Sequence, residues 1–262
     1  MVLLALAPLL ILIPSVVAGP ATPAATASGI PPVIWELVSF SETDGVPVTI
    51  TDPSRYTVQF LPDGRLLTRL DCHHGHGRYT AAVGVLALTP LAVTTATCPL
   101  DSEGTRFQSI LESATSYAFD PDGVLLLHGD RGSLHLRPTL TGVRWEWQTF
   151  QGSDGTIVRP DDPSQYTVEF LPDGTLAIQA ACHHAVGTYT VSNSTVDLRI
   201  GERTPAICPR GALMERFLRD LDQVTSHVFR DGKLYLALPM DAGIHAFAPT
   251  SIAPPAATPA AG

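Results

Sequence analysis

The chain has 262 residues, of which 25 are acidic and 16 basic, giving a net charge of -9 at pH 7. The negative net charge and the absence of any run of basic residues argue against a protein that binds nucleic acid by neutralising phosphates. Lys233 is the only lysine, and neither GxxxxGK[ST] nor GxGxxG occurs, which argues against nucleotide-dependent enzymes as well. With 21 glycines, 23 prolines and 45% hydrophobic residues, the composition indicates a globular protein with many turns and short strands.

The chain begins with an apolar segment, and Pro, Ala and Thr are concentrated near both ends. Residues 1–18 end in the small-residue pattern Val16-Val17-Ala18, which predicts a secretory signal peptide. A retained membrane anchor is the alternative, although the segment is shorter than the roughly 20 residues of a spanning helix. Residues 19–32 and 250–262 are predicted as a disordered linker and a disordered tail. We therefore expect a secreted or extracytoplasmic protein, in the periplasm or cell envelope, which meets a membrane only if residues 1–18 are retained.

A repeat with a spacing of 110 residues organises the rest of the chain. The recurring pairs include Trp35 and Trp145, Tyr56 and Tyr166, Phe60 and Phe170, Cys72 and Cys182, Cys98 and Cys208, and Phe107 and Phe217. A period this long suits an independently folding domain rather than a solenoid unit. The sequence therefore predicts two copies of one domain, over residues 33–138 and 143–249.

Within each copy, the local patterns follow the same order. Residues 56–68 and 166–178 are each typical of a β-hairpin around a Pro-Asp-Gly turn, and further antiparallel strands are expected up to a closing Asp-Gly hairpin. One segment per copy has helical spacing instead: Phe107, Ile110 and Leu111 in the first, and Met214, Phe217, Leu218 and Leu221 in the second. We predict a mainly β (α+β) fold of two small antiparallel domains, each with one packed α-helix.

The four cysteines form two equivalent pairs, Cys72 with Cys98 and Cys182 with Cys208, each separated by 26 residues. In an exported chain this pattern predicts one disulfide inside each domain. Free buried thiols in a cytosolic protein are the alternative.

Histidines follow the first cysteine of each pair and raise the possibility of a metal site. His73, His74 and His76 follow Cys72, and His183 and His184 follow Cys182. Three points weaken this interpretation: Val186 replaces the third histidine in the second copy, neighbouring strand residues point to opposite faces, and a disulfide would consume the thiolates. No metal site and no cofactor are therefore assigned, and these five histidines are the candidates in the alternative.

Catalytic motifs are also absent from the sequence. There is no G-x-S-x-G, no H-E-x-x-H and no single cysteine with a free partner base, and Asp71 in the first copy is replaced by Ala181 in the second. We expect a binding module rather than an enzyme.

Each copy resembles the META domain, a family that includes the bacterial heat-inducible HslJ proteins. The matching elements are the opening Trp35-Glu-Leu37 (Trp145-Glu-Trp147), the F-x-x-D-G turns, the G-x-Y motifs that end at Tyr79 and Tyr189, and the Thr-rich segments that end at Cys98 and Cys208. The family usually has G-C-N where this chain has Asp71-Cys72-His73 and Ala181-Cys182-His183. The resemblance implies an incomplete antiparallel barrel of lipocalin-like character, a location in the envelope or outside the cell, a link to stress, and no established enzymatic activity.

Two functions are consistent with these observations. The first is a non-enzymatic, extracytoplasmic tandem META-domain protein that binds an unknown protein or a small apolar ligand, or supports the envelope under stress. The alternative is a periplasmic metal-binding protein that uses the Cys-His-His clusters.

Overall fold

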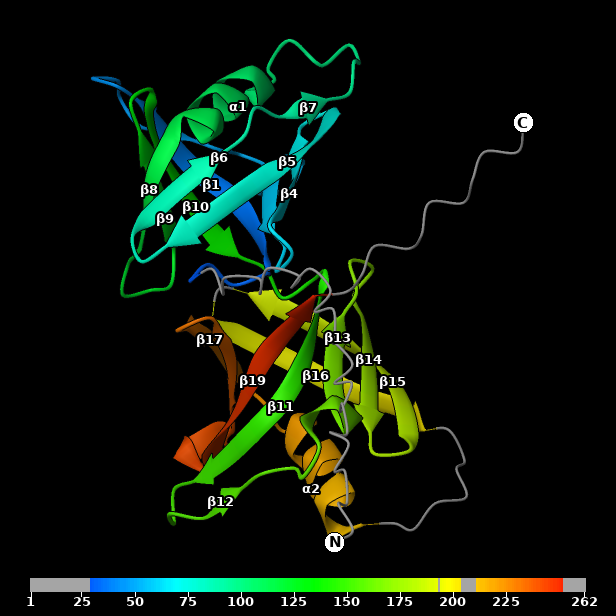
Figure 1. Cartoon of the computed structure of the whole chain (residues 1–262). Coiled ribbons are helices and arrows are strands. Elements are labelled where there is room, and N and C mark those ends of the chain that lie inside the picture. Colours follow the sequence, from blue (N-terminus) through cyan, green and yellow to red (C-terminus); the bar gives the residue numbers. More distant parts are fainter. Residues whose placement is uncertain (1–28, 193, 204–210, 252–262) are drawn as a thin grey trace, which may run out of the picture.

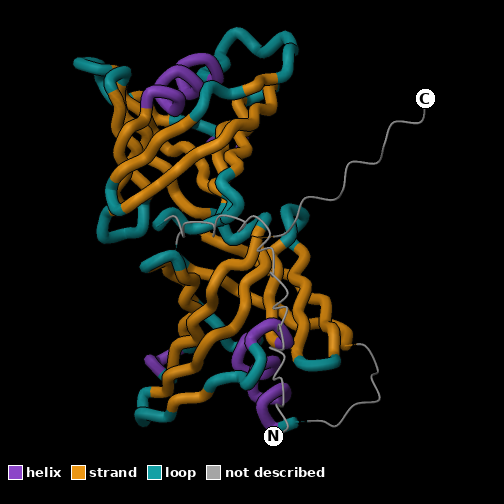
Figure 2. Tube along the Cα trace, viewed as in Figure 1, coloured by secondary structure: helices purple, strands orange, loops and turns teal. Residues whose placement is uncertain are grey.

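The computed structural model describes residues 29–192, 194–203 and 211–251. The predicted signal peptide, residues 1–18, lies outside this range, as do residues 19–28 of the predicted linker and 252–262 of the predicted tail. Among the described residues, no helix has the length and apolar character needed to span a bilayer. Figure 2 shows two bodies built almost wholly of strands, which we call barrel 1 and barrel 2.

Barrel 1 is a closed ring of eight antiparallel strands, ordered β10-β9-β8-β6-β5-β4-β3-β1 and sealed by pairing between β10 and β1. Its ring strands are β1 (Ile34–Glu42), β3 (Tyr56–Phe60), β4 (Arg65–Leu70), β5 (His73–Ala82), β6 (Val85–Leu88), β8 (Ala114–Phe119), β9 (Leu125–Gly129) and β10 (Gly132–Pro138). The additional elements are β2 (Val48–Thr49), η1 (Pro53–Arg55), β7 (Ala92–Val93) and α1 (Gly104–Ser113).

Barrel 2 repeats this arrangement, and pairing between β11 and β19 joins the two ends of its sheet. Its ring strands are β11 (Val143–Gly152), β13 (Tyr166–Phe170), β14 (Thr175–Ala180), β15 (His183–Ser192), β16 (Thr195–Arg203), β17 (Ser226–Arg230), β18 (Lys233–Ala237) and β19 (Gly243–Ser251). The additional elements are β12 (Ile157–Val158), η2 (Pro163–Gln165), α2 (Ala212–Leu221) and η3 (Pro239–Asp241). The prediction of two mainly β domains with one α-helix each is confirmed, and the sheets close where incomplete barrels were expected.

Alternating apolar residues fill the barrel interiors. In β3, Tyr56, Val58 and Phe60 are buried while the residues between them are partly exposed, as a strand with one face on the core requires. The buried side of α1, which includes Phe107, packs on the same core. An eight-stranded barrel is just wide enough for side chains to fill its interior, and here most of those side chains are aromatic or aliphatic.

Each barrel begins with a short lead-in segment that caps its tryptophan. The Nε1 group of Trp35 donates to the carbonyl of Pro31 at 3.2 Å, and that of Trp145 donates to the carbonyl of Leu140 at 2.9 Å. Ile30, 110 residues before Leu140, is only 2% exposed. The folded part of barrel 1 therefore starts upstream of residue 33, within the segment predicted as linker, and β19 extends two residues into the predicted tail.

Candidate functional site

A cavity of about 600 Å³ lies where the two barrels meet. Figure 1 shows the barrels stacked, with α1 and α2 near the ends that face away from each other. The cavity is lined by the lead-in of barrel 1, by the β8–β9 and β17–β18 turns and by the end of β10: Gly29, Pro31, Val33, Trp35, Phe119, Asp120, Pro121, Gly123, Pro138, Phe229, Arg230, Asp231 and Gly232. Equivalent hairpins of the two repeats thus face each other across it.

The β8–β9 turn is rigidly built. The Asp120 carboxylate oxygen Oδ1 accepts hydrogen bonds from the backbone N–H groups of Asp122 at 2.9 Å and Val124 at 2.8 Å. Gly123 adopts a φ of +81°, which a residue with a side chain rarely does. The turn approaches barrel 2 so closely that a Cβ atom on Gly123 would lie 2.9 Å from the carbonyl oxygen of Phe229.

Three aromatic residues line the cavity, Trp35 and Phe119 of barrel 1 and Phe229 of barrel 2, and the rings pair within each barrel. The ring centroids of Trp35 and Phe119 are 5.8 Å apart, and those of Trp145 and Phe229 are also 5.8 Å apart. Phe119 is 41% exposed, which is high for a phenylalanine. Sequence analysis does not single out Phe119 or Phe229, although their own spacing of 110 residues is a signal that would have found them.

The chemistry of the cavity suits an apolar ligand with a polar end. Its walls are mainly aromatic, proline and valine side chains, and its volume is within the range of small-molecule sites. Polar character comes from Asp120, Arg230 and Asp231. Arg230 is exposed and makes no ion pair within the described ranges, so its guanidinium is available to a ligand group.

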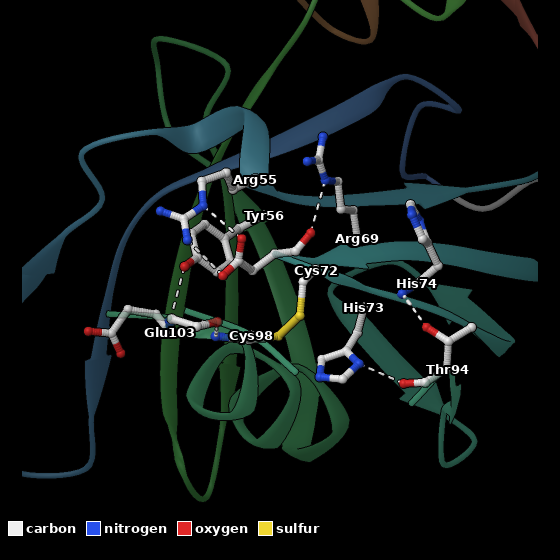
Figure 3. The surroundings of a disulfide bond; sticks show 12 residues. Arg55, Tyr56, Arg69, Cys72, His73, His74, Thr94, Cys98 and Glu103 are labelled. Atoms are coloured by element: carbon white, nitrogen blue, oxygen red, sulfur yellow. Dashed lines mark hydrogen bonds and ion pairs between the residues drawn. A yellow bond between two sulfur atoms is a disulfide. The ribbon is translucent and has the colours of Figure 1, made fainter. Parts of the chain in front are cut away.

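The disulfide predicted between Cys72 and Cys98 is present, with a Cα–Cα distance of 5.5 Å (Figure 3). It ties the start of β5 to the segment that leads into α1. Cys182 is also disulfide-bonded, and its predicted partner, Cys208, lies outside the described residues.

A bidentate ion pair lies next to the first disulfide. The Arg55 Nε and Nη2 groups donate to the two Asp71 carboxylate oxygens, each at 2.7 Å. The hydrogen bond from Arg55 outweighs burial and lowers the pKa of the Asp71 carboxyl. The second copy has Gln165 and Ala181 at these positions, so the pair belongs to barrel 1 alone.

The candidate metal-ligating histidines are spread over both faces of their strands. His73 is half-buried with its Nδ1 atom 2.6 Å from the Thr94 carbonyl oxygen, whereas His74 is exposed (Figure 3). His76 is exposed as well. In barrel 2, His183 is half-buried and His184 exposed. The donor atoms of His73, Cys72 and Cys98 lie within 4.8 Å of one another, but the disulfide leaves these sulfurs without the thiolate that a metal needs.

Comparison with known proteins agrees with the two-barrel organisation. The family model described as the META domain matches residues 32–138 and again residues 138–248. No curated protein matches the chain.

Two solved structures are similar to parts of the chain. An NMR structure of a protein from Burkholderia xenovorans has 17% identity and a TM-score of 0.36, over 43% of this chain and 85% of that one. The crystal structure of a DUF4847-family protein from Bacteroides vulgatus has 16% identity and a TM-score of 0.34, over 44% of this chain and 96% of that one. Since the family model covers both barrels, the chain belongs to the META domain family, with two tandem copies of the domain.

Proposed function

We propose that this protein is a non-enzymatic, extracytoplasmic binding protein, and that its ligand is a small, mainly apolar molecule held in the cavity between the barrels. The observation that carries the proposal is the cavity itself, with aromatic and proline walls and a volume of about 600 Å³. Its lining residues include no serine, cysteine or histidine that would act as a nucleophile or base. A role in supporting the cell envelope under stress belongs to the same proposal.

Two further observations support the compartment and the ligand class. A disulfide such as Cys72–Cys98 persists in oxidising compartments such as the periplasm. Phe119 and Phe229 line the cavity and would pack on a ligand, and the exposed Arg230 would bind one polar or anionic group. The ligand would therefore bury its apolar body between the two hairpins and direct its polar end towards solvent.

Binding of N-phenyl-1-naphthylamine, a neutral dye that fluoresces in apolar sites, tests this proposal. We expect saturable binding to the native protein and at least tenfold weaker binding to the Phe229→Ala variant, because the ring forms one wall of the cavity. Val228→Ala is the matched control, since Val228 is the adjacent, exposed residue of β17 and does not line the cavity. Equal affinity in the two variants, or no saturable binding to the folded native protein, would contradict the proposal.

The metal-binding alternative rests on the short distances among Cys72, His73 and Cys98. It requires the disulfide to be reduced, because a cysteine ligates a metal through its thiolate. Thermal unfolding of the reduced protein with and without Zn²⁺ distinguishes the two functions: we expect no stabilisation by Zn²⁺, whereas a metal-binding protein would be stabilised.

A further inference from the structure

The cores of the two barrels differ at one pair of equivalent positions. In barrel 1, Ile110 of α1 and Leu134 of β10 are both buried apolar residues. Their counterparts in barrel 2 are Asp220 of α2, which lies 110 residues after Ile110, and His245 of β19. The strand registers establish the second equivalence, since Phe40 pairs with Leu134 and Phe150 pairs with His245. An apolar pair has thus been replaced by an ionisable pair, and both members of the new pair are buried, at 5% and 0% exposure.

His245 and Asp220 lie against each other across the interface between α2 and the barrel. The Nε2 atom of His245 is 3.4 Å from the Asp220 carboxylate oxygen Oδ2. The imidazole packs on aromatic rings of β11, with its centroid 4.6 Å from that of Phe150 and 5.5 Å from that of Trp147. A charge on this ring would therefore have Asp220 as its near partner and apolar rings on its other sides.

A neighbouring arginine also differs in its ion pairs between the two copies. In barrel 1, the Arg106 guanidinium lies over the Phe40 ring and pairs with the part-exposed Glu42 and Glu103. In barrel 2, the equivalent Arg216 lies over the Phe150 ring, 4.2 Å from its centroid, and pairs with the buried Asp220 at 3.2 Å. The two glutamates are replaced by Gly152 and Leu213, so the guanidinium turns towards the core.

The charged groups around His245 come mainly from α2. This helix supplies Asp220, Arg216 and Arg219, whose Nη2 group is 3.3 Å from Asp220. The turn between β11 and β12 supplies Asp154, which interacts electrostatically with Arg216. The packed elements β11, β13 and β19 present the rings of Trp147, Phe150, Tyr166 and Phe247.

These surroundings favour a neutral imidazole and an ionised carboxylate. Burial lowers the pKa of His245, and the opposing attraction of Asp220 does not compensate for it. Burial alone would raise the pKa of Asp220, but the nearby His245 imidazole and the Arg216 and Arg219 guanidinium groups outweigh it, so the pKa of Asp220 is lowered. An Asp220 that stays ionised keeps its ion pairs with the two arginines.

We propose that the Asp220–His245 pair makes barrel 2 an acid-responsive unit, in which protonation of His245 on mild acidification releases α2 from the barrel while barrel 1 keeps its helix in place. When α2 is released, His245 becomes solvated and takes up a proton near pH 6.5. The closed state is thus fully stabilised above about pH 6.5 and loses stability as the pH falls from there towards the lower pKa of the buried ring. The equilibrium constant for opening rises by up to tenfold per pH unit over that window.

Release of α2 would expose apolar surface that barrel 1 keeps covered. Phe217 stacks on Trp147, with ring centroids 4.9 Å apart, and Leu218 and Leu221 are buried on the same helix. An acid-opened barrel 2 would expose these side chains to solvent, while the inter-barrel cavity, which α2 does not line, stays intact.

Hydrogen exchange measured by mass spectrometry on the full chain tests the proposal, because α1 is an internal control for α2. Protection of peptides covering residues 212–221 and 104–113 is compared at pH 7.0, 6.5, 6.0 and 5.5, each normalised to its unprotected rate. We expect the ratio of opening constants, α2 over α1, to increase several-fold to tenfold between pH 6.5 and 5.5. A ratio that stays constant would overturn the proposal.

Two variants separate His245 from other titrating groups. Asp220→Ile combined with His245→Leu installs the pair found in barrel 1, and we expect it to remove the pH dependence of the ratio. His227→Asn is the control, since burial also lowers the pKa of His227, which lies on β17. Loss of the pH dependence in the His227 variant but not in the double variant would contradict the proposal.

If the double variant does not fold, a measurement on the native protein tests the role of His245. The NMR titration of the His245 ring is expected to show a midpoint below pH 6.5. A midpoint at or above 6.5 would overturn the proposal, because protonation would then not oppose the closed state.

Discussion

Gly77 and Gly187 occupy equivalent positions on β5 and β15, but an added methyl group would meet different neighbours. At Gly187 it would overlap the backbone carbonyl of Arg199 on β16, which cannot move without disturbing the strand pairing. At Gly77 the nearest atom would be Cδ2 of Leu91 at 2.9 Å, the end of a flexible side chain. We expect Gly187→Ala to lose about 1–3 kcal/mol of unfolding free energy and Gly77→Ala clearly less, measured by urea denaturation. Equal losses would show that the close approach of β16 is not what constrains Gly187.

Asp71 gives the stability of barrel 1 a pH dependence of its own, separate from that proposed for barrel 2. Since Arg55 lowers the pKa of this carboxyl, the contribution of Asp71 to stability is present above the unfolded-state pKa of about 3.9 and is lost as the pH falls through the lower folded value. We expect Asp71→Asn to reduce stability at pH 7 and to flatten the acid dependence of barrel 1 between about pH 4 and the lower folded pKa, as followed by thermal unfolding.

Asp101→Asn is the matched control for this variant. Asp101 lies 3.6 Å from the same guanidinium, but its side chain is 76% exposed, and exposed ion pairs contribute little. If both variants changed stability alike, the net charge near Arg55 would be responsible rather than the buried bidentate pair.

For single residues, the sequence predicts the structural role of those that recur in both copies and misses the role of those that differ between the copies. The cysteine pair at 72 and 98 follows from its repetition. His245 is missed because its counterpart Leu134 is 111 residues away, one more than the repeat, and because burial of a strand residue depends on pairing with a distant strand. Asp220, on a short helix, has the spacing of a core position, but its polar side chain suggests the surface.

At the level of secondary-structure elements, the disulfide joins the start of β5 to the segment before α1. It thereby restrains the longest connection between ring strands in barrel 1, which runs from β6 to β8. A closed loop of 26 residues contributes about 3–4 kcal/mol in the chain-entropy treatment. We expect the double variant Cys72→Ser, Cys98→Ser to lose about that amount in urea denaturation. The Cys72→Ser, Cys98→Ser protein should also become insensitive to dithiothreitol in barrel 1, and an unchanged midpoint would mean that the loop is already restrained by packing.

The elements themselves are predictable where the signal is local. The Pro-Asp-Gly turns appear between β3 and β4 and between β13 and β14, and the two helices contain the residues whose spacing predicted them. Closure of the barrels is not predictable in this way, because it depends on pairing of β1 with β10 and of β11 with β19. These pairs join residues about 100 positions apart, and no local pattern encodes them.

For the whole molecule, alanine substitutions at two glycines test how closely the barrels pack against each other. Gly123 and Gly174 have nearly the same φ, +81° and +84°. A Cβ atom at Gly174 would have only the carbonyl oxygen of Tyr189, 3.7 Å away, whereas at Gly123 it would press on Phe229 of the other barrel. We expect Gly174→Ala to lose about 1–2 kcal/mol through backbone strain alone.

Gly123→Ala should lose more and should also weaken binding of N-phenyl-1-naphthylamine, because the cavity walls would be pushed apart. Thermal unfolding and dye titration of both variants check this. If the two variants behaved identically in both measurements, the contact between the barrels would be too loose to define a site.

The candidate site could not be predicted from the sequence because it belongs to neither repeat. Phe119 and Phe229 are separated along the chain by one full repeat of 110 residues, and they line the same cavity only when the two hairpins face each other. The repeat predicts that the hairpins exist, but not that they come together.

The closing strand pair also places the two ends of each domain side by side. Trp35 pairs with Pro138, and the Thr139 N–H donates to the Ile34 carbonyl at 2.9 Å. A domain whose N- and C-terminal strands are adjacent can be duplicated in tandem with a connector as short as residues 139–142. A single duplication event therefore suffices to build this chain. It should equally tolerate circular permutation, with the native ends of barrel 1 joined and new ends opened at Val83, which is 98% exposed between β5 and β6.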